Sequence, residues 1–163
     1  MRVCGDAFGK SVLETDTVVC DAGFVDSFSV EGRAFIDAGL ISSQIKKILR
    51  EKGIPEEVVR KVAVVTFEAE VNIISYAEVG TISFQIAPDA ITIEAVDKGP
   101  GIPDIDLALQ EGYSTADDTI RDMGFGAGMG LPNIKKFSDI FEIKSEVGEG
   151  TYLKSIIRIN GSP

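Results

Sequence analysis

The segment 55–77 constrains the fold more than any other part of the chain, because it keeps one helical period over several turns. Pro55 and the acidic pair Glu56 and Glu57 are typical of a helix start, where proline fits the first turn and carboxylates suit the positive end of the helix dipole. Apolar residues follow at three- and four-residue steps, namely Val58, Val62, Val65, Ala69 and Ile73. We therefore expect one long helix with a buried face.

Runs of β-forming residues come in two pairs after this helix. Segments 81–87 and 90–96 are separated by a short turn-forming stretch, and so are segments 140–146 and 151–159, as two hairpins require. Helices combined with antiparallel strand pairs favour an α+β fold over a doubly wound parallel one. We expect a two-layer α/β sandwich whose mixed, mostly antiparallel sheet carries its helices on one face.

The part before the long helix is harder to assign. Segments 28–30 and 34–36 resemble short strands, and Ser42 or Ser43 could cap a helix that ends at Gly53. Serine side chains favour such capping positions because their oxygen can accept a hydrogen bond from a free N–H of the first turn. We therefore expect two strands and one capped helix in this region.

The chain length of 163 residues fits one compact domain with a hydrophobic core. Residues 1–26 show no sustained periodicity, so we expect an N-terminal extension there and a single domain over 27–163. The stretch 112–126 is polar and contains glycines, with little to bury. We expect this stretch to be a mobile lid.

Glu68 and Asn72 stand four residues apart in the long helix, so a carboxylate and a carboxamide point from the same face. Polar helix positions usually face water, and a solvated polar stripe would explain this pair if it stood alone. The alternative is a site that uses both side chains. The choice between them depends on the segments that follow.

The sequence Asp97-Lys98-Gly99-Pro100-Gly101 comes directly after an expected strand. Glycines there permit close backbone approach and dihedral angles that other residues adopt only at a cost. A simple turn explains the segment equally well. In a binding site, Asp97 would accept a hydrogen bond from the exocyclic amine of a purine, and Gly99 and Gly101 would leave room for the ring.

Residues 124–131 form the run Gly-Phe-Gly-Ala-Gly-Met-Gly-Leu, which has glycine at every second place and leads into an expected helix. Such a layout exposes successive backbone N–H groups beside a positive helix end, which is a natural phosphate cradle. A flexible loop is the alternative. The run lacks the Gly-Lys-Ser/Thr ending of a Walker loop, and it precedes no βαβ unit as a Rossmann fingerprint would.

The charge and composition limit the partners and the chemistry. A formal net charge of -10 repels nucleic acid and anionic lipid, so we expect neither as a partner. An anionic nucleotide would need local dipoles and a divalent cation to overcome that field, which favours bound magnesium. The chain has no histidine, so acid–base chemistry falls to carboxylates, lysine or tyrosine.

Features of cellular location are few. No stretch approaches the roughly 20 apolar residues that span a bilayer, and the start lacks the layout of a signal peptide. Cys4 and Cys20 match no zinc spacing and are expected to be thiols. We expect a cytoplasmic protein.

Taken together, in this order and spacing, the three segments resemble the GHKL superfamily of ATPases and kinases, over about residues 27–160. Closer details resemble the bacterial anti-sigma-factor serine kinases, and the switch-type kinases of stress signalling most of all. These details are Glu-Gly-Tyr-Ser-Thr at 111–115, Gly-Ala-Gly-Met-Gly-Leu-Pro at 126–132 and Gly-Glu-Gly-Thr at 148–151.

The resemblance implies a role for each segment in binding ATP and Mg²⁺. It implies that Asn72 gives its side-chain oxygen to magnesium, that Asp97 binds the adenine amine and that Thr151 helps to hold the adenine. It also implies that Glu68 orients or deprotonates the attacking hydroxyl. The resemblance further implies that the glycine segments bind the nucleotide through Gly99, Gly101, Gly124, Gly126, Ala127, Gly128, Met129, Gly130 and Leu131.

The implied activity is that of a serine/threonine protein kinase that phosphorylates a serine on a STAS-domain partner. A sigma factor or another regulator is a further candidate partner, and a homodimer is compatible with the resemblance. The alternative is an anti-sigma-like binding module that uses ATP to shape a protein-binding surface and transfers little or no phosphate. A histidine kinase is disfavoured, since the chain has no histidine to phosphorylate.

One position departs from the family pattern. Three residues after the magnesium-binding asparagine, relatives often have Lys or Arg directed at the nucleotide, whereas this chain has Ser75 followed by Tyr76. Arg121 in the lid or Lys98 beside the adenine loop could supply the missing charge to the phosphates. The sequence positions neither of them.

Overall fold

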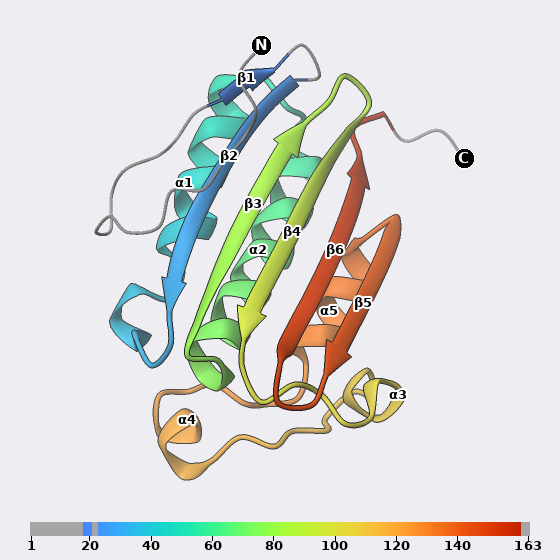
Figure 1. Cartoon of the computed structure of the whole chain (residues 1–163). Coiled ribbons are helices and arrows are strands. Elements are labelled where there is room, and N and C mark those ends of the chain that lie inside the picture. Colours follow the sequence, from blue (N-terminus) through green and yellow to red (C-terminus); the bar gives the residue numbers. More distant parts are fainter. Residues whose placement is uncertain (1–17, 21–22, 161–163) are drawn as a thin grey trace, which may run out of the picture.

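The structure, a computed structural model, describes residues 18–20 and 23–160, which form one antiparallel sheet with helices packed on one face (Figure 1). The sheet order is β1-β2-β3-β4-β6-β5, and every pair of neighbours is antiparallel. The strands are β1 (Val18–Cys20), β2 (Gly23–Glu31), β3 (Val79–Ile86), β4 (Ala90–Lys98), β5 (Ile140–Glu146) and β6 (Gly150–Arg158). The expected α+β sandwich is confirmed.

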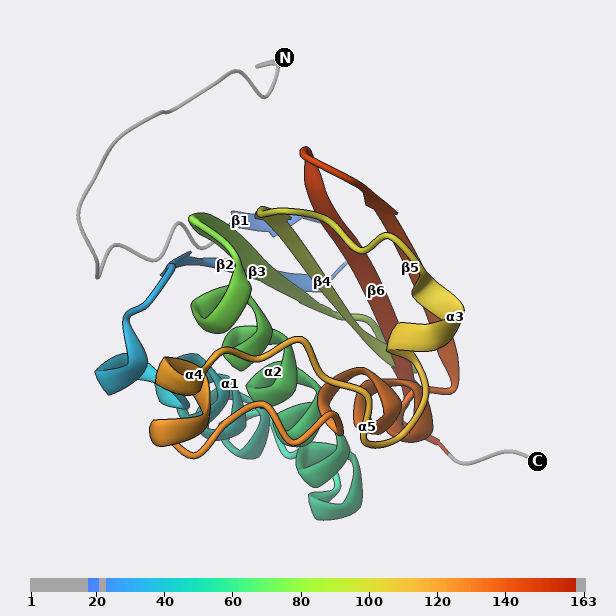
Figure 2. The ribbon, with the colours of Figure 1, turned by 90° about the horizontal axis from the view of Figure 1, so that it is seen from below.

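Three longer helices cover one face of the sheet, and shorter elements lie at its end (Figures 1 and 2). The covering helices are α1 (Leu40–Glu51), α2 (Glu56–Tyr76) and α5 (Gly130–Phe137). The shorter elements are the 3-10 turn η1 (Phe35–Asp37) and the helices α3 (Ile105–Ala108) and α4 (Asp118–Asp122). No helix in the described ranges is both long and apolar enough to cross a bilayer.

Helix α2 spans the predicted segment and lies against the middle of the sheet, which fixes where its polar face ends up (Figure 1). The five apolar residues that predicted this helix are all buried: Val58, Val62, Val65, Ala69 and Ile73. They meet the inward side chains of the central strands, such as Ile82 and Phe84 on β3 and Ile93 on β4. In the last turns of α2, Glu68 and Asn72 are only partly buried.

The N-terminal boundary of the sheet lies earlier than residue 27. Strand β1 and the first residues of β2 belong to the part that the sequence assigned to the extension, and β2 pairs with β3 from Phe24 to Glu31. Residues 1–17 of that expected extension, including Cys4, lie outside the described residues.

The expected strand at 34–36 is wrong, because the chain turns away from the sheet directly after β2. The N–H of Gly32 donates to Glu78 O (2.9 Å), and the N–H of Arg33 donates to Ile74 O (2.7 Å). Arg33 has a φ of 64°. These contacts redirect the chain into the 3-10 turn η1 over Phe35–Asp37.

The expected serine cap of the first helix is also wrong. Helix α1 begins at Leu40, and its first N–H groups are satisfied by a side chain from α2. The carboxylate of Glu70 accepts hydrogen bonds from the N–H groups of Ile41 (3.3 Å) and Ser42 (3.4 Å). Burial raises the pKa of Glu70, and the N–H groups of α1 act in the opposite direction. Glu70 thus joins two helices, a role that no local pattern predicted.

Candidate functional site

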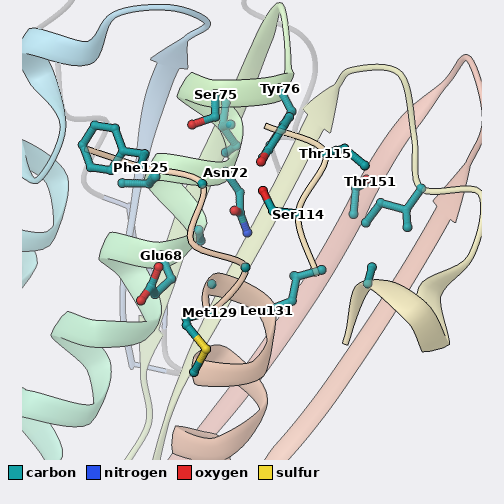
Figure 3. Close-up of a pocket in the computed structure, with 18 of the residues that line it drawn as sticks. Glu68, Asn72, Ser75, Tyr76, Ser114, Thr115, Phe125, Met129, Leu131 and Thr151 are labelled. Carbon is teal, nitrogen blue, oxygen red and sulfur yellow. The ribbon is translucent and has the colours of Figure 1, made fainter. Parts of the chain in front are cut away.

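A cavity of about 690 Å³ opens at the end of the sheet where β4 ends, between α2, the lid and the start of α5 (Figure 3). Ligand sites of this size are typical for drug-sized molecules and cofactors. The cavity is lined by all but one of the site residues that the sequence indicated. These are Glu68, Asn72, Asp97, Gly101, Gly124, Gly126, Ala127, Gly128, Met129, Gly130, Leu131 and Thr151.

Gly99 is the exception, since it lines a neighbouring groove with Arg33, Tyr76 and Glu78. Its place in the chain still matters for the site. A Cβ added at Gly99 would lie 3.0 Å from Oδ1 of Asp97 and 3.2 Å from the Cα of Ala77. Gly99 therefore allows the chain to pass close to the end of α2 and leaves the Asp97 carboxylate in place.

Glu68 and Asn72 project from α2 toward the start of α5 (Figure 3). A Cβ added at Gly130, the first residue of α5, would lie 3.1 Å from Oδ1 of Asn72 and 3.4 Å from Oε2 of Glu68. Glycine at this position thus lets the helix start approach both polar groups closely. Glu68 and Asn72 therefore line a cavity, and their use as a binding site stays a prediction.

Asp97 is half-buried near the end of β4 and is held by the adjacent strand. The N–H of Thr151 on β6 donates to its Oδ1 at 3.2 Å, and within the described residues the other carboxylate oxygen has no partner. Burial raises the pKa of Asp97, while the Thr151 N–H acts in the opposite direction. A half-buried carboxylate with a free oxygen is well suited to accept a hydrogen bond from a ligand amine.

Two glycines allow close backbone contacts near Asp97, one between the following loop and the end of β5 and one between β6 and Asp97 itself. Gly101 has a φ of 71°, and a Cβ there would lie 2.1 Å from Glu146 O. Gly150 has a φ of 134°, and its added Cβ would lie 2.0 Å from Asp97 O. No other residue fits either position without moving the backbone.

Ser145 is a residue of this region that the sequence did not single out. Its hydroxyl accepts a hydrogen bond from the N–H of Ile102 (2.8 Å) and lies 2.8 Å from the hydroxyl of Thr151. It also contacts Gly150 O at 2.9 Å. Ser145 thus joins the loop after Asp97 to the hairpin of β5 and β6, and the only sequence signal for it is its place just before the glycine turn.

The glycine run folds as a cradle beside the cavity. Gly124, Gly126 and Gly128 have φ values of 85°, 84° and 76°, a region that favours glycine. A Cβ at Gly128 would lie 2.5 Å from the carbonyl carbon of Gly112, whose N–H donates to Gly128 O at 2.9 Å. The run therefore has a defined path that leads into α5, which a simple flexible loop does not explain.

The lid is attached to the rest of the domain more firmly than its polar sequence indicated. Its helix α4 buries Ile120, while the other residues of the stretch 112–126 are exposed or partly buried, in keeping with the expectation that it has little to bury. The Phe125 ring stacks on Phe35 of η1 with centroids 6.1 Å apart. Arg33 forms an ion pair with Asp117 at 3.2 Å, although both side chains are about half exposed. These partners lie some 90 residues away in the sequence, so a local reading could not find them.

The cavity wall lacks positive side chains, since none of its residues in the described part of the chain is Lys or Arg. Ser75 lies in the wall and is buried, and its hydroxyl has no hydrogen-bond partner among the described residues. Arg121 donates to Ala116 O (3.1 Å) within the lid, and Lys98 is exposed at the end of β4. Neither compensates for Ser75 in this conformation.

The donor set fits a nucleotide with magnesium. A hard cation such as Mg²⁺ takes oxygen ligands and often few from the protein, with phosphates and water as the others. Asn72 offers such an oxygen, and the described residues hold no group of three or more acidic, cysteine or histidine side chains that would form an all-protein metal site. N–H groups after Phe125 and at the start of α5 are of the kind that could bind phosphates.

The fold and this site define a class of ATP-binding domain. Residues 37–157 match the family of histidine kinase-like ATPase domains, and the chain belongs to that family. The expected resemblance to the GHKL superfamily is therefore confirmed.

The chain is similar to a bacterial serine/threonine-protein kinase and to bacterial anti-sigma F factors. The chain is 38% identical over 89 residues to the serine/threonine-protein kinase RsbT of Bacillus subtilis (strain 168). The matched segment covers 52% of this chain and 61% of the kinase. It is 32% identical over 117 residues to the anti-sigma F factor of Thermoanaerobacter sp. (strain X514), which covers 72% of this chain and 74% of that protein. It is 37% identical over 70 residues to the anti-sigma F factor of Clostridium beijerinckii, or 43% of this chain and 46% of that protein.

Proposed function

We propose that the protein is a cytoplasmic serine/threonine protein kinase that binds ATP with magnesium and phosphorylates a serine on a STAS-domain partner. One observation carries the proposal. Glu68 and Asn72 on α2, Asp97 on β4 and the glycine run before α5 are far apart in sequence and line a single cavity. The similarity to a protein named as a serine/threonine kinase supports the same activity, although the match spans only 61% of that kinase.

In this proposal the adenine lies at the β4 and β6 side of the cavity. The free oxygen of Asp97 accepts from the adenine amine, and Thr151 holds Asp97 in place through its backbone N–H. Gly101, which lines this side of the cavity, would leave room for the ring, and Gly150 lets β6 approach the backbone of Asp97, where a Cβ would collide with its carbonyl oxygen. These contacts select adenine over other nucleobases but do not take part in phosphoryl transfer.

The phosphates lie toward the start of α5. The N–H groups of Gly124 and Phe125 already donate to Arg121 O and Ile120 O, so the later N–H groups of the run and those of the first turn of α5 would bind phosphate oxygens. Asn72, beside Gly130, would offer its oxygen to the metal. Magnesium would supply positive charge, which no described side chain of the cavity wall provides. The protein therefore contributes mainly positioning and dipoles.

Glu68 is the proposed general base. It lies beside the same helix start as Asn72, and its Oε2 faces Gly130. A carboxylate is the natural choice for this step in a chain without histidine. Glu68 would accept the proton of the partner's serine hydroxyl as that oxygen attacks the γ-phosphorus.

A second function is favoured by the lack of Lys or Arg in the cavity wall and by the buried Ser75. Transfer would then be slow or absent, and nucleotide binding would instead set the shape of a surface for a sigma factor or another regulator. The similarity to proteins named anti-sigma F factor is compatible with this function. The two functions differ in one measurable product, a phosphorylated partner.

The test is to incubate the protein with magnesium, ATP labelled on its γ-phosphate and a STAS-domain protein from the same genome neighbourhood. We expect label on a serine of the partner, lost when that serine is replaced by alanine. An added phosphate of about -1.5 to -2 charge should also dissociate the complex with the partner or lead to a different complex. Nucleotide binding with no transferred label would instead support the binding module.

A further inference from the structure

Asn133 on α5 contacts the side chain proposed to act as the base. Its Nδ2 donates a hydrogen bond to Oε1 of Glu68 at 2.8 Å, across 65 residues of sequence. Both side chains are half-buried. Neither the helix pattern nor the glycine run singled out Asn133, and its side chain has no other hydrogen bond within the described residues.

The position of Asn133 is fixed by the helix on which it lies. Its N–H donates to Met129 O at 2.9 Å, and the next residue, Ile134, is fully buried in the core. Gly130 lies one turn earlier on α5 and faces the same two side chains of α2. The amide of Asn133 is therefore presented to Glu68 by a packed element and not by the lid.

The hydrogen bond gives the two carboxylate oxygens of Glu68 different partners. Oε1 of Glu68 is occupied by Asn133, and Oε2 is the oxygen nearer to Gly130, where the helix start and Asn72 lie. A glutamate has three rotatable bonds, so a single carboxylate would otherwise sample several orientations. A donor held at 2.8 Å removes much of this freedom before any ligand binds.

We propose that Asn133 is a positioning residue for phosphoryl transfer, holding Glu68 so that Oε2 points at the attacking hydroxyl; this rests on the proposed kinase function. In that step Oε2 takes the proton of the hydroxyl, and the hydroxyl oxygen forms a bond to the γ-phosphorus. The bond from the γ-phosphorus to the bridging oxygen breaks, and ADP leaves with that electron pair. Asn133 exchanges no proton and touches no reacting atom.

The first experiment measures kcat for the partner and KM for ATP in Asn133→Ala. We expect kcat to fall about 10- to 100-fold, because small misplacements of a reacting group cost this much, with KM for ATP within about twofold of wild type because Asn133 binds no nucleotide. Asn133→Gln keeps an amide donor and should recover part of the rate. Lys135→Ala, at an exposed position on the same helix, is the matched control and should leave kcat unchanged.

The second experiment separates positioning from a role in stability. Asn133→Ala is introduced into Glu68→Gln, and single-turnover transfer is measured together with the thermal midpoint of each variant. If Asn133 acts through the Glu68 carboxylate, the double variant should be no slower than Glu68→Gln alone. A structural role would instead slow both backgrounds by the same factor and lower the thermal midpoint in both.

The outcomes distinguish this inference from the function on which it rests. A wild-type protein that transfers no label overturns the proposed kinase function and the role of Asn133 with it. An active wild type with unchanged or raised kcat in Asn133→Ala overturns only the role of Asn133. Equal losses of rate from Asn133→Ala in the wild type and in Glu68→Gln overturn it as well. A loss of kcat that occurs in the wild type and not in Glu68→Gln supports it.

Discussion

Asp97→Ala is expected to weaken ATP binding by about 10- to 100-fold or more, because a hydrogen bond to a charged group is worth about 1.5–3 kcal/mol and each 1.4 kcal/mol is tenfold. The carboxylate is half-buried and its free oxygen is the acceptor proposed for the adenine amine. The dissociation constants of ATP and GTP, measured by calorimetry, check this expectation. The wild type should prefer ATP, and the variant should lose most of that preference, since a site built to pair one amine rejects ligands that lack it.

Asp89→Ala is the matched control for this measurement. Asp89 is an exposed acidic residue in the turn between β3 and β4, away from the cavity. Its removal changes the net charge of the protein as Asp97→Ala does, and it should leave both affinities unchanged. If Asp97→Ala binds ATP as tightly as the control, then Asp97 does not accept a hydrogen bond from the adenine amine.

Glu68→Gln should lower kcat for phosphoryl transfer by about 10²- to 10⁴-fold, the range found when a general base is lost. The change keeps the shape of the side chain and removes only its ability to accept the proton. The ATP affinity should stay within about twofold of wild type, since Glu68 is proposed to act on the hydroxyl. Rates of label transfer at saturating ATP, together with calorimetric affinities, measure both quantities.

Glu57→Gln is the control, because Glu57 is an exposed glutamate in the first turn of the same helix. It should transfer phosphate at the wild-type rate. A Glu68→Gln variant that binds nucleotide and keeps the wild-type kcat would show that another group accepts the proton. The Asn133 contact would then have no catalytic meaning either.

The elements with a sustained local pattern were predictable from sequence. Helix α2 and the β3–β4 and β5–β6 pairs match expectation to within a few residues, because the alternation of buried and exposed positions that reveals them also drives their packing. The candidate site residues could be selected for a different reason, their resemblance to a family motif. Their order along the chain matches a known pattern, and α2 and β4 each carry one part of it to the same end of the sheet.

What could not be predicted depends on contacts between distant segments. The turn η1 replaces a strand because Gly32 and Arg33 bond to residues more than 40 positions away. The start of α1 is satisfied by Glu70, 28 residues from Ser42. Asn133 meets Glu68 only because α5 packs on α2. No local propensity encodes such pairs, since they exist only once the layers have assembled.

The most direct test of the nucleotide site is the equilibrium affinity for ATP with and without magnesium, measured by calorimetry on the wild-type protein. With Asn72 as a metal ligand and no Lys or Arg among the described residues that line the cavity, the phosphates depend on the cation for charge. We therefore expect saturable binding that weakens by about tenfold or more when magnesium is chelated. In Asn72→Ala this dependence on magnesium should be lost. Wild-type protein that shows no saturable binding of ATP with magnesium present would contradict the site itself.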